Sequence, residues 1–177
     1  QLLGGIPITQ YLAVTASALP VLNDAVGGVT VTINEPGMAE RDPSLQMGAT
    51  VTLKGDQAET YLRYRDVTQA NTAVSRMSRH REYMKAWMEK AKTAAASDDS
   101  FGADLMDSIK NVMVTNMAKD QYLNLGMEIL QSGETLNDET MLMLPGEAAA
   151  GTYYDEYYPD QEAIDDLVLE LFYRPAE

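Results

Sequence analysis

The stretch LKGDQAETYLRYR, residues 53–65, determines more about the fold of this chain than any other segment. Its first residue is the last of Val51–Leu53, a segment whose apolar and β-branched residues predict a brief strand. Residues 56–62 predict a short helix that leads into Arg63 and Arg65. If residues 61–66 are instead extended, the two-residue spacing places both guanidinium groups on one face of a strand. Such a pair could clamp a single anion.

The segments before this stretch predict strands around a helix. Residues 29–33 alternate apolar and polar β-branched side chains, which is a strong strand pattern. A helix is predicted over residues 19–26, ended by the glycines at 27–28, and residues 10–14 predict a short strand before it. This order predicts a βαβ-like unit. Residues 34–48 contain two prolines and two glycines and predict a surface loop.

The segments after the stretch are mostly helical. Helical spacing of apolar residues predicts helices over about 73–95, 102–113 and 118–131. A buried strand is predicted at 141–144, followed by a tyrosine-rich loop and a last helix that begins at Pro159. Strands interleaved with helices predict an α/β fold, as an α/β/α sandwich with a mixed central sheet to which this chain supplies only some of the strands.

Composition limits the functions that this chain can have. A length of 177 residues with 45% hydrophobic and 23% charged residues predicts one folded domain over 1–177. The net charge of −14 argues against nucleic acid and generic polyanion binding, so any anion needs a local site. The chain has no cysteine, which excludes disulfides and thiolate chemistry, and no stretch of about 20 apolar residues that could span a bilayer.

Arginine is concentrated in one part of this acidic chain. The seven arginines are Arg41, Arg63, Arg65, Arg76, Arg79, Arg81 and Arg174. Arg76, Arg79 and His80 lie at i, i+3 and i+4 near the start of the long predicted helix, so they share one face, and a helix N-terminus adds positive potential. Guanidinium groups bind phosphate oxygens through paired hydrogen bonds, which suits a diphosphate. The cluster therefore predicts an arginine-lined anion site.

Simpler interpretations remain open for these charged residues. The arginines could form surface ion pairs with neighbours such as Asp66 and Glu82, as most helix charges do. His80, the only histidine, could be a general base or a partly buried hydrogen-bonding residue. The acidic pairs at 98–99 and 165–166 could ligate a metal, but their spacing is more typical of solvated charges.

The tyrosines at 153, 154, 157 and 158 also allow two interpretations. They could stack on sugar rings, or the segment could pack over a sheet edge.

The order of several segments resembles the LytR-CpsA-Psr family of cell-wall glycopolymer ligases. The resemblance is carried by LGGIPITQY at 3–11, AVGGVTV at 25–31, LKGDQA and YLRYR within 53–65, RMSRH at 76–80, VTN at 114–116 and LPG at 144–146. The segment at 53–65 is the most specific of these, and the motifs follow one another over most of the chain.

The resemblance implies an enzyme that transfers an anionic glycopolymer, of the wall teichoic acid or capsular polysaccharide type, from a polyprenyl-pyrophosphate carrier to peptidoglycan. It implies that Arg63 and Arg65 hold the pyrophosphate as catalytic residues, with Arg76, Arg79 and His80 as substrate-binding residues. His80 stands where the family usually has glutamine, but it can still donate a hydrogen bond. The resemblance also implies Mg²⁺, with ligands expected upstream of this chain and none within it.

The resemblance also implies an extracytoplasmic location, with the protein anchored in the cell membrane and facing the cell wall. Because the chain starts at Gln1 without an initiator methionine, we expect it to be the C-terminal portion of a LytR-CpsA-Psr-like catalytic domain. The anchor and the early strands would then be absent, and this portion alone would be inactive. The alternatives are a non-catalytic extracytoplasmic polyanion- or wall-binding module of the same fold, and a cytosolic anion sensor.

Overall fold

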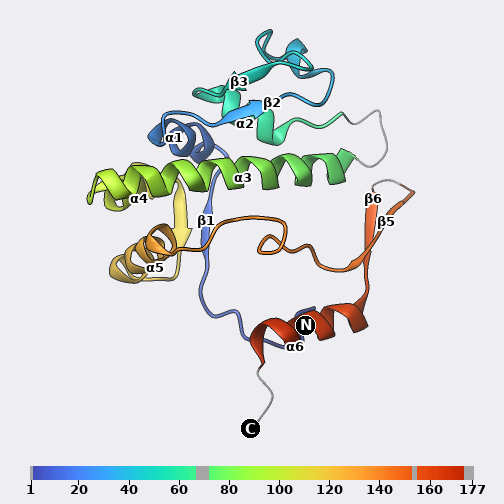
Figure 1. Cartoon of the computed structure of the whole chain (residues 1–177). Helices are drawn as coiled ribbons and strands as arrows, with labels where there is room; N and C mark the ends of the chain where they lie inside the picture. Colours follow the sequence, from blue (N-terminus) through green and yellow to red (C-terminus); the bar gives the residue numbers. More distant parts are fainter. Residues whose placement is uncertain (1, 67–71, 153–154, 174–177) are drawn as a thin grey trace.

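The long helix α3 (Thr72–Ser97) organises the molecule. The computed structural model describes residues 2–66, 72–152 and 155–173. In Figure 1, α3 crosses the middle of the molecule, with β2, β3 and α2 above it and α5 and α6 below it. The helix is long because residues 72–97 contain neither glycine nor proline, and it buries Tyr83 and Ala91. The prediction of a helix over about 73–95 is confirmed.

The layer above α3 is built on an antiparallel strand pair. β2 (Thr30–Thr32) pairs with β3 (Thr50–Thr52), and Val31 lies opposite Val51. On the exposed face, threonine hydroxyls meet across the pair at 2.9 and 3.2 Å, whereas Val31 points into the core. Both predicted strands are confirmed, and the pair gives the region a hydrophobic face.

Helix α1 (Ala18–Ala25) enters this layer and ends as the sequence predicts. Gly27 and Gly28 follow it with φ of 76° and 86°, values that favour glycine. A Cβ atom at Gly28 would lie 2.4 Å from the carbonyl oxygen of Leu53. Any other residue at 28 would therefore push α1 away from the segment that leads into the arginines.

The strands form pairs rather than one continuous sheet. β1 (Leu12–Val14) pairs with β4 (Met113–Thr115), and β5 (Gly146–Ala150) pairs with β6 (Asp155–Pro159), both antiparallel. The two strands that flank α1 therefore belong to different pairs, and the predicted βαβ-like unit is wrong. Among the described residues the fold is α/β with three antiparallel pairs.

The remaining elements complete the chain. They are the 3₁₀ turn η1 (Met38–Glu40), α2 (Asp56–Arg63), α4 (Phe101–Ile109), the 3₁₀ turn η2 (Lys110–Val112), α5 (Lys119–Gln131) and α6 (Gln161–Phe172). α5 and α6 confirm their predicted helices. The alternative of an extended 61–66 is wrong, because α2 continues through Arg63.

The strand predicted at 141–144 is also wrong. Leu142 and Met143 are exposed and unpaired with any described strand, and the strand instead starts at Gly146. A run of four apolar residues can belong to a strand or to another buried element. Here the residues that pair in a hairpin come later in the chain, from Gly146 onward.

The core has two parts that share Trp87. The first lies between β2, β3, α2 and α3 and contains Leu53 and Tyr61, which are nearly inaccessible to solvent. The second joins α3 to α4 around Phe101 and Ala91, with α5 packed against it. Trp87 contacts both parts and donates a hydrogen bond to the carbonyl oxygen of Leu22 at 2.8 Å.

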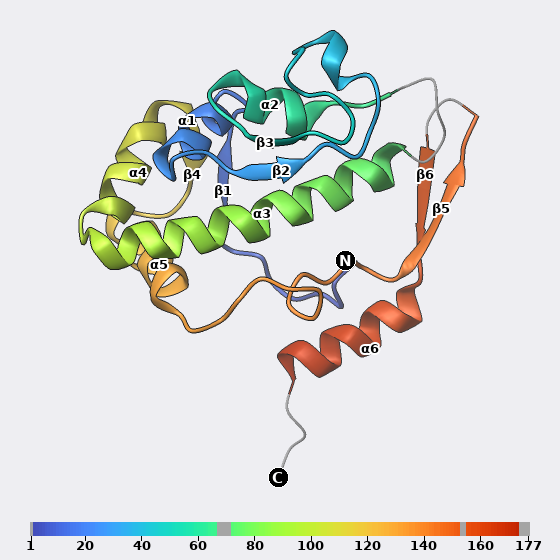
Figure 2. The ribbon, with the colours of Figure 1, turned by 45° about the horizontal axis from the view of Figure 1, so that its top comes forward.

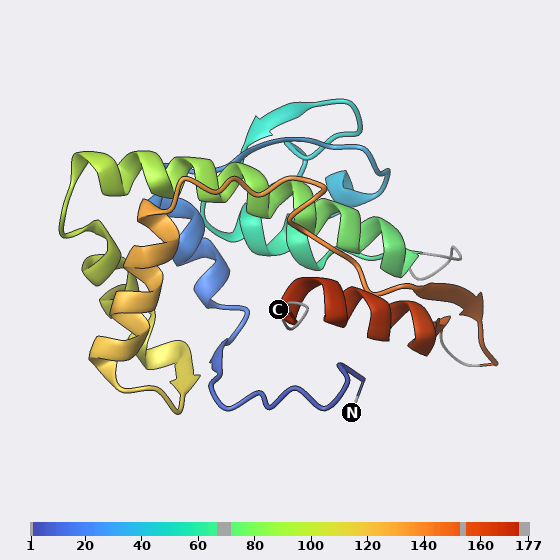
Figure 3. The same cartoon turned by 60° about the horizontal axis from the view of Figure 1, so that its bottom comes forward.

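Helix α6 lies beside the first residues of the chain, away from the α3 core (Figures 2 and 3). Ile164 and Val168 form its buried side, and Gln161 Nε2 donates to the carbonyl oxygen of Leu2 at 3.2 Å. Asp160 caps the helix by accepting a hydrogen bond from the Ala163 N–H. The two ends of the described chain are therefore packed against each other.

Candidate anion-binding cleft

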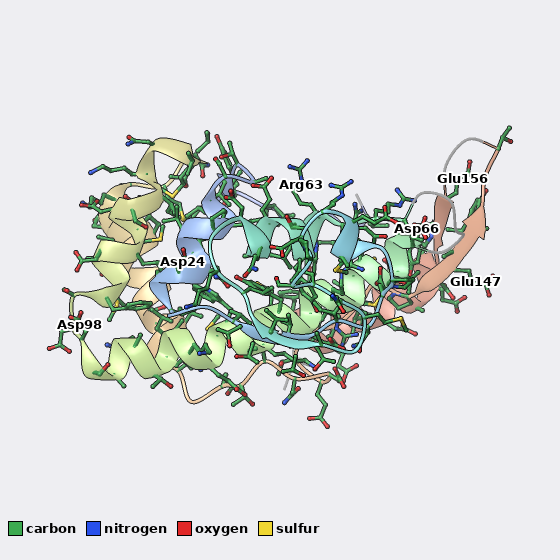
Figure 4. The ribbon with its side chains drawn as sticks, turned by 90° about the horizontal axis from the view of Figure 1, so that it is seen from above. Asp24, Arg63, Asp66, Asp98, Glu147 and Glu156 are labelled. Atoms are coloured by element: carbon green, nitrogen blue, oxygen red, sulfur yellow. The ribbon has the colours of Figure 1, made fainter. Side chains whose placement is uncertain are left out.

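A cleft of about 400 Å³ opens beside α2, in the layer above α3. It is lined by Arg41, Asp56, Glu59, Thr60, Arg63 and Arg65. Three guanidinium groups thus meet in one cleft, two of them from the pair that the sequence predicted to share a partner. Figure 4 shows Arg63 projecting outward from the ribbon.

Helix α2 supplies the acidic wall of the cleft and Arg63. The helix begins at Asp56 and lines the cleft with Glu59, Thr60 and Arg63, which lie within one turn of one another. Arg63 Nη1 donates to Glu59 Oε1 at 2.6 Å, four residues away, and the Arg63 side chain is 64% exposed. Exposed ion pairs of this spacing stabilise a helix by only about 0.3–0.5 kcal/mol. Arg63 can therefore exchange Glu59 for an external anion at little cost.

Arg65 reaches the same cleft from the segment that follows α2. The guanidinium Nε donates to the Thr72 hydroxyl at 2.9 Å, in the first turn of α3. This hydrogen bond fixes the side chain between the two helices. Arg63 and Arg65 thus line one cleft although the chain between them is not a strand, and their binding of a common anion stays a prediction.

Arg79 and His80 bind the end of α2 rather than lining the cleft. Arg79 Nε and Nη2 donate to the carbonyl oxygens of Tyr61 and Tyr64 at 3.2 and 2.5 Å. His80 Nε2 lies 2.7 Å from the carbonyl oxygen of Leu62, a contact in which the ring N–H donates. The last carbonyl groups of a helix have no partner within it and carry partial negative charge. A cation and a ring N–H from α3 satisfy them here.

Arg79 also fixes the start of the loop at 34–48. It is 4% exposed, and its guanidinium Nη1 forms an ion pair with Glu35. The same group lies 5.8 and 5.9 Å from the centres of the Tyr61 and Tyr64 rings. Burial, together with the negative charge of Glu82, raises the pKa of Tyr61 to about 12. The tyrosine therefore stays neutral beside the buried cation.

These contacts show where the predicted residues on α3 lie. Arg79 and His80 share a helix face as predicted, but that face is occupied by α2. Arg76 is half-buried, and no hydrogen bond or ion pair connects it to another described residue. It does not line the cleft. The substrate-binding roles of Arg76, Arg79 and His80 stay predictions, and the geometry gives Arg79 a positioning role.

The sequence analysis missed Arg41, the third arginine of the cleft. It follows η1 in the loop at 34–48 and lies 6.0 Å from the centre of the Tyr64 ring. Nothing in its neighbours Glu40 and Asp42 indicates an anion site. The available signal was its place in a long loop rich in proline and glycine, because such loops are often functional.

The described residues do not provide a fitting Mg²⁺ site. No three histidine, aspartate or glutamate side chains among them come together as metal ligands. In the cleft, Glu59 is already paired with Arg63, and the three positively charged guanidinium groups would repel a metal ion. The pairs at 98–99 and 165–166 lie on exposed surface. We therefore assign no step to a metal held by these residues.

The tyrosine segment is a strand rather than a loop where it is described. Tyr157 donates its hydroxyl proton to the carbonyl oxygen of Leu144 at 2.5 Å, and Tyr158 lies 2.5 Å from a Glu156 carboxylate oxygen. Tyr153 and Tyr154 lie outside the described residues, and so does Arg174. The described tyrosines lie on the β5–β6 hairpin, and neither lines the arginine cleft.

Comparison with known sequences relates most of the chain to one family. The model described as the LytR_cpsA_psr family matches residues 1–171. The polyisoprenyl-teichoic acid–peptidoglycan teichoic acid transferase TagU of Bacillus cereus is 29% identical over 171 residues, which are 94% of this chain and 52% of TagU. TagU of Bacillus anthracis is 27% identical over 169 residues, with the same coverage. The chain thus spans about half the length of the curated relatives it matches.

Solved structures share the fold at lower sequence identity. TagT of B. subtilis superposes with a TM-score of 0.62 and 19% identity, over 94% of this chain and 60% of TagT. A structure described as TagT bound to LI-WTA gives 0.64 and 22%, with the same coverage. A protein from Enterococcus faecalis described as a transcriptional regulator gives 0.67 and 22%, over 96% of this chain and 61% of that one. These likenesses confirm the predicted α/β fold class.

Proposed function

The chain belongs to the LytR-CpsA-Psr family, and from this membership we propose that it forms part of a cell-wall glycopolymer transferase. The proposed substrate is an anionic glycopolymer, of the wall teichoic acid or capsular polysaccharide type, on a polyprenyl-pyrophosphate carrier. The proposed acceptor is peptidoglycan. The names of the TagU relatives, which combine a polyisoprenyl-linked teichoic acid with peptidoglycan, support this proposal.

In the proposed reaction, an acceptor hydroxyl of peptidoglycan attacks the phosphorus that carries the glycopolymer. A new phosphorus–oxygen bond forms and the bond from that phosphorus to the bridging oxygen breaks. The polyprenyl monophosphate leaves with the bonding electrons, and the hydroxyl proton passes to solvent. Such a transfer needs positive groups fixed around the phosphate oxygens, where negative charge is greatest.

The structural observation that supports the proposal most directly is the convergence of Arg63 and Arg65 in one open cleft. Each side chain is held near the cleft, Arg63 by Glu59 at 2.6 Å and Arg65 by Thr72 at 2.9 Å. Prior positioning lowers the entropy that is lost when an anion is bound. The two arginines would hold the diphosphate during transfer, while Arg79 and His80 hold the helix that carries Arg63.

The proposed location is outside the cytoplasm, at the membrane and facing the wall, because the proposed acceptor is peptidoglycan. Within residues 2–66, 72–152 and 155–173, the structure contains no helix with the length and apolarity to cross a bilayer. An anchor in the full-length protein is part of the proposal. Mg²⁺ also stays a prediction, which binding measurements with and without the ion test.

The proposal is tested by binding of geranyl pyrophosphate to the 177-residue chain, measured by calorimetry at low salt with and without Mg²⁺. We expect Arg63→Ala and Arg65→Ala each to weaken binding by about tenfold or more, since hydrogen bonds to charged groups contribute about 1.5–3 kcal/mol. Lys90→Ala is the matched control, because it removes one positive charge outside the cleft.

Unchanged affinity in both arginine variants would contradict the proposal. Binding that requires both arginines, without transfer to peptidoglycan by the full-length protein, would instead favour the non-catalytic polyanion- or wall-binding module.

A further inference from the structure

Arg41 lines the same cleft as Arg63 and Arg65 but comes from a different segment of the chain. It is exposed and directly follows η1, within the loop at 34–48. Its guanidinium group lies over the Tyr64 ring, at 6.0 Å from the ring centre. Tyr64 is the residue between Arg63 and Arg65 in the sequence, so Arg41 packs against the segment that carries the other two arginines.

Buried side chains anchor the loop that carries Arg41. Met38 and Leu45 lie on either side of Arg41 and are fully buried in the first core. The Tyr64 hydroxyl donates to the carbonyl oxygen of Pro36 at 2.9 Å. Gly37 permits this approach, because a Cβ atom there would lie 2.1 Å from the Tyr64 hydroxyl oxygen. The loop is thus packed onto the end of α2 rather than extended into solvent.

A polar network fixes the other side of the loop to α2. Asp42 accepts hydrogen bonds from the Ser44 N–H at 2.9 Å, from the Ser44 hydroxyl at 2.7 Å and from Gln57 Nε2 at 3.0 Å. Gln57 Nε2 also lies 2.8 Å from the Ser44 hydroxyl oxygen. These hydrogen bonds lower the pKa of Asp42, so the carboxylate that holds the loop stays ionised. Arg41, which precedes Asp42, is therefore presented to the cleft on a fixed support.

Arg41 decides whether the residues that line the cleft carry a net positive charge. Asp56 and Glu59 offset two of the three arginines, which leaves the lining with one net positive charge. Without Arg41 the lining would be neutral, in a chain whose net charge is −14. A neutral cleft on such a protein has no long-range attraction for a diphosphate.

We propose that Arg41 is a third anion-binding residue of the cleft, held in place by the loop at 34–48, and that it contacts the diphosphate together with Arg63 and Arg65. The diphosphate as ligand rests on the proposed function. The role of Arg41 rests on the shared cleft, the anchored loop and the charge of the lining. Three guanidinium groups from two segments would surround a diphosphate more completely than a single pair does.

The test measures binding of inorganic pyrophosphate to the 177-residue chain by calorimetry at low ionic strength. The variants are Arg41→Ala, Arg41→Lys, Arg63→Ala, Arg65→Ala and the control Lys90→Ala. We expect Arg41→Ala to raise Kd by about tenfold. Arg41→Lys should recover part of the loss, because it keeps the charge but loses the planar fork. Melting curves of all variants show whether each remains folded, and Arg41→Gln replaces Arg41→Ala if that variant melts early.

The outcomes separate this inference from the proposed function. If Arg41→Ala binds like the unmodified chain while Arg63→Ala or Arg65→Ala binds weakly, the role of Arg41 is overturned and the proposed function stands. If Arg41→Ala binds weakly while both other variants are unaffected, Arg41 binds an anion without Arg63 and Arg65, so the shared three-arginine site and the proposed function both fail. A loss of equal size in Lys90→Ala would also overturn the inference, because net charge rather than contact would then explain the effect.

Discussion

The rim of the cleft, where Arg63 lies, and the base on which α2 rests, where its last carbonyl groups meet α3, both use arginine, but in opposite ways. At the rim, Arg63 is 64% exposed and shares one ion pair with a neighbour on its own helix. At the base, Arg79 is 4% exposed and connects Glu35 to the carbonyl oxygens of Tyr61 and Tyr64. The rim residue has access to external anions, whereas the base residue has its donors committed within the protein. The comparison shows that proximity in a motif does not give two arginines the same task.

The largest expected effect tests the base. Arg79→Ala should lower the free energy of unfolding by about 3–5 kcal/mol, because it leaves Glu35 and two helix-end carbonyl groups without their partner. Urea denaturation measures this loss. Glu35→Gln is the matched variant, since it removes the partner's charge but keeps a hydrogen-bonding side chain, and it should cost less. A loss below about 1 kcal/mol in Arg79→Ala would be typical of a surface residue. It would contradict the claim that Arg79, unlike Arg63, holds the fold together.

A smaller effect tests the neutral tyrosine beside the buried cation. Tyr61 has a pKa near 12 when folded against an ordinary value of 10.0, so between these values the folded chain keeps a proton that the unfolded chain loses. The stability from this group is complete below pH 10 and declines as the pH rises toward 12. The decline should be on the order of 2 kcal/mol. Denaturation at several pH values measures it.

The variant Tyr61→Phe should reduce that decline by the share of Tyr61, while the share of Tyr83, whose pKa burial also raises, should remain. Tyr11→Phe, which removes an exposed phenol, should leave it in place. If the free energy of unfolding depends on pH in both variants as it does in the unmodified chain, Tyr61 does not couple alkaline pH to stability.

The smallest effect is expected for stability at the rim. Arg63→Ala should change the free energy of unfolding by no more than about 0.5 kcal/mol, because its ion pair with Glu59 is exposed to solvent. The measurement is urea denaturation in low and high salt, in parallel with Arg79→Ala. A loss at Arg63 as large as that at Arg79 would show that the rim also holds the fold together, and the division of roles would then be wrong.

Local patterns in the sequence predicted much of the fold. The alternation at 29–33, the glycines at 27–28 and the helical spacing over 73–95 each give the observed element. These signals depend on backbone preferences and on one buried face, which neighbouring residues encode directly. The same reasoning failed at 141–144, where an apolar run has no described strand partner, because pairing depends on residues far along the chain.

The candidate site was only partly predictable. Arg63 and Arg65 were found because they lie two residues apart, and their shared cleft is a property of that short separation. Arg41 lies 22 positions before Arg63 and carries no pattern of its own, so only the packing of Met38 and Leu45 brings it to the same cleft. The opposite holds for Arg79, which the sequence placed with the anion-binding residues and the structure buries.

The sequence by itself determined most of the elements, the family and the local excess of arginine in an acidic chain. The tertiary structure alone decided which arginines face solvent and which are buried, because that choice depends on where the end of α2 meets α3. Helix ends leave carbonyl groups that need donors, and Arg79 and His80 lie where they can supply them. The guanidinium groups left facing the cleft at the other side of α2 are the ones that can bind an external anion.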